Sequence, residues 1–224
     1  MRAVLMSVSP KEVEAIANGV KTLILKKTKP KLETPFKVYI YCTKNKRQWL
    51  RKVGTSVREI FITENLDGLG RTDKVKAVIG DEGTFWENGG YNGRAIGEFV
   101  CDSIETLSEK DLFYGMDELS CSRIEEYSCA DLDELLRYKG TNENLYGWGI
   151  SNLVIYDKPK ELSEFSKTCD NYWRYDDYDK CYGCDYYYCD SNPSCGREEG
   201  CYCDGNKPIT RPPQSWCYVE ECKK

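Results

Sequence analysis

The chain has 224 residues, of which 40% are hydrophobic and 31% are charged, and its formal net charge is -5. This length and apolar content support one good core plus a small appendage. No segment holds the roughly 18 consecutive apolar residues that a membrane-spanning helix needs, so we expect no membrane partner.

The charge is unevenly distributed along the chain. Residues 1–60 carry fourteen Lys or Arg and four Asp or Glu, a net of +10, so the remainder carries -15. We call this basic N-terminal region, residues 1–60, the basic front. In an otherwise acidic protein it favours a local site for an anionic ligand over general binding of nucleic acid along the surface. A solvated lysine-rich face is the alternative interpretation.

The start of the chain lacks the pattern of a secretory signal, because its apolar run stops after Met6. We therefore expect a cytoplasmic protein, and disulfides are rarely kept in that compartment. The thirteen cysteines are an odd number, which makes complete intramolecular pairing impossible.

The first elements predicted are a strand, a helix and a strand. Ala3 to Met6 is short and apolar, and the following SPKE predicts Ser9 as a helix cap, Pro10 at the first helical position and Glu12 in a reciprocal capping box. The helix is expected to end at Gly19 in a left-handed conformation. The stretch KTLILKK then favours a strand with Leu23 and Leu25 on one face and Thr22, Ile24 and Lys26 on the other.

The segment FKVYIYCT alternates and predicts a half-buried strand, with Phe36, Val38, Ile40 and Cys42 on one face and Lys37, Tyr39, Tyr41 and Thr43 on the other. Residues 44–92 are polar, glycine-bearing and insertion-like, although KAVIG near Lys76 favours a further strand. In GRAIGEFVCDSI the glycines Gly93 and Gly97 flank and interrupt a strand, which is typical of a bend or bulge.

A second helix is predicted in SCADLDELLRYKG, with Ser128 as its cap and Gly140 as its stop. YGWGISNLVIYDKP then favours one or two strands that end at Pro159. Beyond Phe165 the pattern loses its periodicity, so we place a boundary near Lys167, with a domain of residues 1–167 and a cysteine-rich tail of residues 168–224. The fold class is α+β: short, mostly antiparallel strands closed by glycine bends into a small mixed β-barrel with peripheral helices.

Several stretches resemble the ASCH domains of the PUA-like superfamily, in particular those encoded by phages and prophages. The resembling stretches are AVLMSVSPKEVEAIANGVKT, GRAIGEFVCDSI, YGWGISNLVIYDKPKELSEF and the closing RPPQSWCYVEE, which together span most of residues 3–221. The resemblance implies a small PUA-like barrel with a cleft suited to RNA or a nucleotide-like ligand.

The resemblance also implies site residues. Some family members hydrolyse acylated cytidine or RNA with a lysine, a threonine and a glutamate, which correspond here to Lys21, Thr22 and Glu98. The family motif Gly-x-Lys-x-x-Glu-x-Arg is interrupted, because its acidic position is Ile24 and its arginine position is Lys26. Gly149 stands where close relatives commonly carry histidine.

These departures weaken a catalytic role and leave a binding role intact. An isoleucine cannot position a base or tune its pKa, and a lysine lacks the planar fork of arginine. Binding needs only the charges of Lys21 and Lys26, the carboxylate of Glu98 and the face of Trp148, on which a base could stack. In the alternative interpretation, Trp148 fills the barrel and Glu98 forms an ion pair with a lysine.

The densest cysteine cluster lies near the end of the chain, where nine of the thirteen thiols fall between Cys169 and Cys222. Cys181 and Cys184 have the spacing that lets two thiolates hold one Zn²⁺. Since the chain has no histidine, we predict a structural four-thiolate site. Its predicted ligands are Cys169, Cys181, Cys184 and Cys217, with Cys201 or Cys203 as the replacement.

A zinc site would stabilise a tail that has many tyrosines and acids but few aliphatic side chains for a core. A disulfide framework is the alternative if the protein leaves the cell, and an iron–sulfur cluster is a third interpretation, although the ferredoxin spacing is missing. The functional hypotheses are an RNA- or nucleotide-binding protein, a small hydrolase acting on acylated nucleosides or RNA through Lys21 and Glu98, and a protein-interaction module that uses the acidic aromatic tail.

Overall fold

The computed structural model describes residues 2–54, 59–65, 91–114, 124–168, 188–189, 201–202 and 206–220. The elements are β1 (Arg2–Val8), α1 (Pro10–Ala17), β2 (Leu23–Lys26), β3 (Phe36–Cys42), β4 (Gln48–Gly54), β5 (Glu59–Asn65), β6 (Ala95–Cys101), β7 (Ile104–Ser108), α2 (Glu109–Tyr114), α4 (Leu132–Lys139), β8 (Asn144–Gly149), β9 (Ser151–Lys160), η1 (Leu162–Glu164), β10 (Ser166–Thr168), β11 (Tyr188–Cys189), β12 (Cys201–Tyr202), β13 (Asn206–Pro208) and β14 (Trp216–Glu220).

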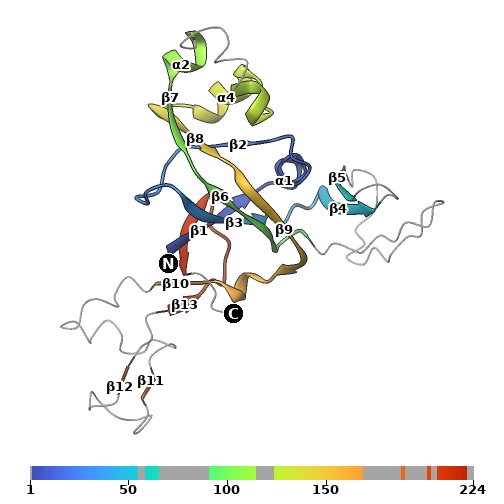
Figure 1. Ribbon diagram of the computed structural model, residues 1–224, viewed down its shortest axis with the longest axis vertical. Helices are drawn as coiled ribbons and strands as arrows, with labels where there is room; N and C mark the ends of the chain where they lie inside the picture. The colour runs from blue at the N-terminus through green and yellow to red at the C-terminus, as the bar shows by residue number, and fades with distance from the viewer. Residues whose placement is uncertain are drawn as a thin grey trace.

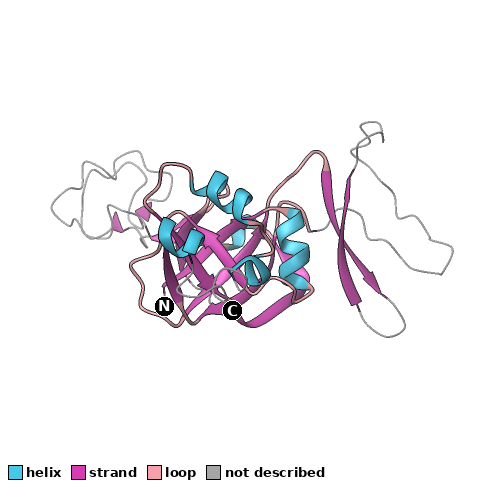
Figure 2. Cartoon of the chain, turned by 90° about the horizontal axis from the view of Figure 1, so that it is seen from above, coloured by secondary structure: helices cyan, strands magenta, loops and turns pink. Residues whose placement is uncertain are grey.

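A seven-stranded mixed sheet forms the body of the protein, in the order β13-β10-β14-β1-β3-β6-β9. β1 lies in its middle, parallel to β3 and antiparallel to β14. Both faces of β1 are buried, because Val4 and Met6 belong to one apolar cluster while Ala3 and Leu5 belong to another on the opposite face. Figure 2 shows this sheet at the centre of the molecule, with the β4–β5 hairpin to one side.

A second sheet of three strands, in the order β2-β8-β7, lies over the first (Figure 1). The predicted faces of β2 are confirmed: Ile24 packs into the main core, whereas Leu23 and Leu25 pack with the leucines of α2 and α4 in a third cluster. β2 is therefore buried on both sides, between the main core and the helices.

The α+β class is confirmed, but the closed barrel is not. The described strands make a sheet with β13 and β9 at its edges, and the ladders found in this part of the chain do not join those edges. The glycine-directed bend that the sequence predicts does occur. At Gly97 the registers of β6 with β3 and with β9 shift, and an added Cβ would lie 2.4 Å from the Val154 carbonyl oxygen.

Helix α1 has the predicted boundaries. The Ser9 hydroxyl accepts a hydrogen bond from the Glu12 amide, Pro10 occupies the first helical position, and Gly19 follows the helix with φ of +74°. The capping-box prediction is only half right. The Glu12 carboxylate accepts hydrogen bonds from the Ser9 hydroxyl and from Lys21, in place of the Ser9 backbone amide.

The second predicted helix needs a correction at its start. Residues 124–128 form a separate helical turn, which ends because Cys129 adopts a φ of +52°. α4 begins after this break, and its cap is Asp131, whose side chain accepts from the Glu134 amide at 2.8 Å. The predicted stop at Gly140 is confirmed, with φ of +58°.

Two strand predictions also change. β3 is buried on both faces, because Tyr39 and Tyr41, predicted on its exposed face, pack with Phe165. The β4–β5 hairpin was not predicted from the polar sequence of residues 44–92. It packs against α1, and Asn18 holds it by exchanging two hydrogen bonds with the backbone of Phe61. KAVIG lies outside the described residues.

The end of the chain belongs to the main sheet. β14 pairs with β1, and β13 pairs with β10 so that Thr168 lies opposite Asn206. Trp216 anchors this segment: its ring packs on Trp148 and its indole N–H donates to Thr28. Residues 169–205 are thus inserted between two paired strands, and the predicted boundary near Lys167 does not coincide with a break in the sheet.

Candidate ligand-binding pocket

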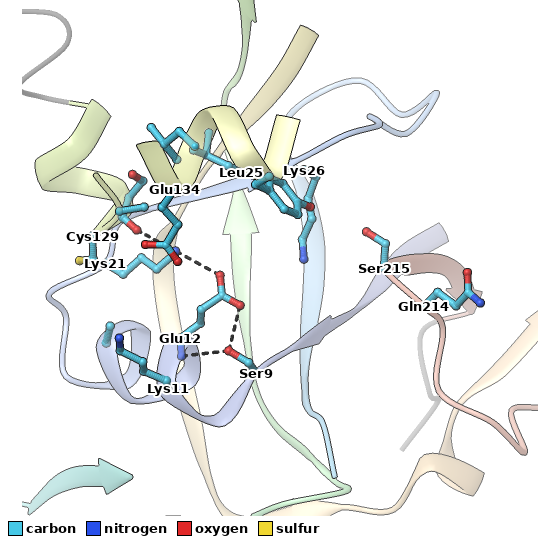
Figure 3. A pocket seen from close by; sticks show the side chains of 15 residues that line it. Ser9, Lys11, Glu12, Lys21, Leu25, Lys26, Cys129, Glu134, Gln214 and Ser215 are labelled. Carbon is cyan, nitrogen blue, oxygen red and sulfur yellow. Dashed lines mark hydrogen bonds and ion pairs between the residues drawn. The ribbon is translucent and has the colours of Figure 1, made fainter. Parts of the chain in front are cut away.

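A pocket of about 440 Å³ lies between α1, β2, α4 and the segment before β14 (Figure 3). Its size is in the range of sites for small molecules. The side chains that line it are Ser9, Lys11, Glu12, Ala15, Lys21, Leu25, Lys26, Ser128, Cys129, Ala130, Glu134, Leu135, Tyr138, Gln214 and Ser215.

Lys21 is one of two buried lysines in this pocket. Its side chain is 7% exposed, and its Nζ donates to the Ser128 carbonyl oxygen at 2.7 Å and to Glu12 Oε1 at 3.2 Å. The left-handed Gly19 directs the chain away from α1, and the Thr22 amide then donates to the Tyr127 carbonyl oxygen. These backbone constraints hold the ammonium group at the wall of the pocket.

Lys26, the last residue of β2, is the second buried lysine. Its side chain is also 7% exposed, and its Nζ donates to the Ser7 carbonyl oxygen at 3.2 Å. Burial lowers the pKa of Lys26, the nearby Glu12 opposes that effect, and Lys21 lowers it further. A lysine kept in this position is held at an electrostatic cost, which an anion in the pocket would relieve.

Glu12 lies between the two lysines (Figure 3). Burial would raise its pKa, but Lys21, Lys26 and the hydrogen bonds from Lys21 and Ser9 outweigh this, so the pKa of Glu12 is lowered. The carboxylate is therefore ionised near neutral pH. With both lysines protonated, the three side chains carry a net charge of +1, which suits an anionic group.

Part of the pocket lining is apolar and aromatic. It is formed by Leu25 from β2 and by Leu135 and Tyr138 from α4. The Tyr138 side chain is 39% exposed, and the Lys27 ammonium lies 5.2 Å from the centre of its ring. Burial, with a smaller contribution from Glu12, raises the pKa of Tyr138, so the ring presents a neutral hydroxyl. The pocket lining thus combines charged side chains with apolar and aromatic ones.

Ser128 contributes an unusual polar group to the wall. Its carbonyl oxygen accepts from Lys21, but its buried hydroxyl has no hydrogen-bond partner among the described residues. A buried hydroxyl in this state costs roughly 1–3 kcal/mol relative to a paired one. The cost is a sign that this wall is not arranged for stability alone.

Glu98 lies elsewhere in the fold. It pairs with Tyr39 across β6 and β3, and its carboxylate accepts from Tyr156 at 2.5 Å and from Lys37 at 3.1 Å. Its neighbour Tyr39 belongs to the cluster on one face of the main sheet, whereas α1 packs its Val13 into the core on the other face. Lys21 and Glu98 are therefore not brought together, and Glu98 has the ion-pair role of the alternative interpretation.

Trp148 and Thr22 are also outside the pocket lining. Trp148 is 0% exposed and packs edge-on against Phe36 and at a tilt against Trp216, so its ring fills the core. No base can stack on that face in this structure. Thr22 is exposed, and its backbone links Tyr127 to Ile150 through two hydrogen bonds. An added Cβ at Gly149 would lie 2.5 Å from the Ser103 hydroxyl, so a histidine does not fit there without rearrangement.

Most of the predicted metal ligands lie outside the described residues: Cys169, Cys181, Cys184 and the alternate Cys203. Of the others, Cys201 is in β12, and Cys217 is in β14, where it packs half-buried beside the second core cluster and burial raises the pKa of its thiol. The described part of the chain contains no group of three or more metal-ligating side chains. Of the acidic aromatic segment proposed for protein partners, the structure describes only Tyr188 and Cys189, which form β11.

Glu12, Ser128 and Tyr138 are functional candidates that the sequence did not reveal. Glu12 and Ser128 were interpreted as helix caps, and only the meeting of α1 with the 124–128 turn makes them neighbours of Lys21. The signal for Tyr138 was its position three residues after Leu135 on an amphipathic helix, which places both on one face. In the described residues, no helix has the length and apolar character needed to span a membrane.

A scan against protein-family models and a search of curated proteins found no match. Solved structures similar to this chain are those of ASCH from Zymomonas mobilis, at 12% sequence identity and a TM-score of 0.47, with 98% of this chain and 88% of that chain covered. A tyrosine-to-phenylalanine mutant and a serine-to-alanine mutant of the same protein give the same TM-score at 12% and 11% identity. We therefore base the function on the pocket itself.

Proposed function

We propose that the protein binds RNA or a nucleotide-like ligand in this pocket, with a phosphate group near Lys21 and Lys26. The observation that carries the proposal is the pair of buried lysines on one side of a single pocket, with one ionised carboxylate between them. A phosphate oxygen is a strong acceptor for ammonium donors. Its negative charge would stabilise the charged form of Lys26, which burial disfavours. The apolar and aromatic part of the lining, with Leu25, Leu135 and Tyr138, suits the sugar and base.

Filter binding of short RNAs to the whole chain, over a salt series, tests this proposal. We expect binding at low salt that weakens with added salt, because phosphate contacts release counterions. Lys26→Met and Lys21→Met should each weaken binding by roughly tenfold or more, which corresponds to loss of one charge-assisted hydrogen bond. Absence of binding by the wild type at low salt would refute the proposal.

Lys31→Met is the matched control for these variants. Lys31 is exposed and does not line the pocket, yet its replacement removes the same unit of charge from the basic front. If Lys31→Met weakens binding as much as Lys26→Met does, the ligand is held by general charge on the surface and not by the pocket.

A hydrolase acting on acylated nucleosides or RNA is the second candidate. Its specific support is the contact of 3.2 Å between Lys21 and Glu12, which supplies a lysine and a carboxylate at one pocket. Such a pair could act as acid and base if binding or desolvation shifted a proton between them. Turnover of an N-acylated cytidine that disappears in Lys21→Ala and Glu12→Gln, and persists in Glu98→Gln, would favour the hydrolase.

We also propose that the inserted cysteine-rich segment is stabilised by a structural zinc ion held by four thiolates, from Cys169, Cys181 and Cys184 with Cys217, Cys201 or Cys203 as the fourth. The support is the sequence spacing and the lack of aliphatic residues in residues 169–205. Protein purified without added metal should contain about one zinc per chain by elemental analysis, and Cys181→Ser with Cys184→Ser should contain none. Metal-free wild-type protein would refute this part.

A further inference from the structure

We infer that Tyr138 is the stacking platform of the pocket, so that the site takes a single nucleotide unit with its phosphate at Lys26 and its base against the Tyr138 ring. This inference rests on the proposed function and specifies how the ligand is recognised. It replaces the role that the sequence suggested for Trp148, whose ring is fully buried.

Among the aromatic side chains that the structure describes, Tyr138 is the one that lines the pocket. Its side chain is 39% exposed and lines the pocket, whereas the exposed Tyr127, at 45%, does not line it. The pocket receives its flat wall from α4, because Leu135 lies three residues before Tyr138 and packs into the third apolar cluster. The buried Leu135 packs the helix against that cluster, and the Tyr138 ring lines the pocket.

Charge around the ring strengthens the case. Lys27, the residue that follows the end of β2 at Lys26, has its ammonium group 5.2 Å from the ring centre. A ring with a cation nearby still offers a π-surface for a base, and a phosphate attached to that base would find Lys26 in the same pocket. The pocket volume of about 440 Å³ is in the range of sites for a single small molecule, so one nucleotide unit is the ligand size that we propose.

Isothermal titration of the whole chain with AMP and with ribose 5-phosphate tests the inference, since the two ligands share the phosphate and the sugar and differ in the base. In the wild type we expect AMP to bind at least about fivefold more tightly, the lower end of what one stacked base contributes. Tyr138→Leu, which keeps an apolar side chain of useful size, should abolish that difference and leave the affinity for ribose 5-phosphate unchanged. Tyr138→Phe should keep the difference.

Tyr127→Leu is the control, because it removes an equally exposed tyrosine close to the pocket but outside its lining. Equal binding of the two ligands by the wild type, or an AMP preference that survives in Tyr138→Leu, would overturn the inference while leaving the proposed function standing. If neither ligand binds and RNA also fails to bind, the proposed function itself fails. Where RNA does bind, the affinities of a 5′-phosphorylated and a 5′-hydroxyl oligonucleotide of one sequence are compared. Tighter binding of the phosphorylated form identifies an RNA end, as opposed to a free nucleotide, as the source of the phosphate.

Discussion

Some side chains in the pocket are buried at a cost to the stability of the fold, and Lys26 is the clearest case. Lys26 is 7% exposed, so its ammonium group loses much of its hydration, and among the described residues it gains the carboxylate of Glu12 nearby and the carbonyl of Ser7 in return. Binding sites commonly retain such groups, because the electrostatic cost is recovered when the ligand arrives. A residue that serves the ligand should therefore be replaceable without loss of stability.

Lys26→Met tests this directly, since methionine keeps the apolar stem without the charge. We expect the free energy of unfolding to stay unchanged or to rise by up to about 1 kcal/mol at pH 7, while RNA binding falls. The pKa of Lys26 is lowered on folding, so between that lowered value and the unfolded value of 10.5 the unfolded chain binds more protons, and wild-type stability rises with pH in that window. The advantage of the methionine variant should thus shrink as the pH approaches 10.5, as measured by urea denaturation. A loss well above 1 kcal/mol at pH 7 would show that Lys26 holds the fold.

At the scale of elements, the sequence predicted correctly those helix ends that are set by interactions within a few residues. Ser9, Pro10 and Gly19 delimit α1 as expected, because a cap, a first-turn proline and a left-handed glycine act within a few residues. Ser128 failed as a cap because a separate helical turn precedes α4, and that turn depends on packing around Ile124. The β4–β5 hairpin was missed for the same reason, since Asn18 on a distant segment holds it.

The two capping candidates of α4 give opposite predictions. Asp131→Ala should lower the free energy of unfolding by about 1 kcal/mol, the usual cost of losing a cap. Ser128→Ala should leave it unchanged or raise it, because the hydroxyl that it removes is buried without a partner in the described structure. Thermal denaturation of both variants decides between them, and a larger loss in Ser128→Ala would mean that the helix begins where the sequence suggested.

The bulge of β6 depends on the absence of a side chain at Gly97. Gly97→Ala would bring a Cβ to 2.4 Å from the Val154 carbonyl oxygen, a backbone atom that cannot turn away. We expect a loss of about 1–3 kcal/mol in urea denaturation, in line with other overpacked sites. Gly54→Ala is the matched control, because an added Cβ there meets no heavy atom within 4 Å. Equal effects in the two variants would mean that backbone freedom, and not the close approach, sets the cost.

At the scale of the whole molecule, the alternation of β3 predicted which residues face the main core but not that the opposite face is also covered. That cover comes from Leu162 in η1, Phe165, Ile209 after β13 and Val219 in β14, all of which lie far from β3 in the sequence. The site has the same origin. Lys21 and Lys26 could be identified from sequence as neighbours on one strand segment, whereas Glu12, Ser128 and Tyr138 join them only through tertiary packing.

The pairing of Thr168 with Asn206 gives the most direct test of this architecture. If residues 169–205 are an insertion in a hairpin, replacing them with an Asn-Gly turn should leave a chain that unfolds cooperatively, because a two-residue turn suits strands paired in this way. A chain that ends at Lys167 should instead lose cooperative unfolding, since it lacks β14, exposes the edge of β1 and removes Trp216 from Trp148. Chemical denaturation followed by tryptophan fluorescence compares the two, with the full chain as reference. A folded chain ending at Lys167 would show that residues 168–224 form a separate unit after all.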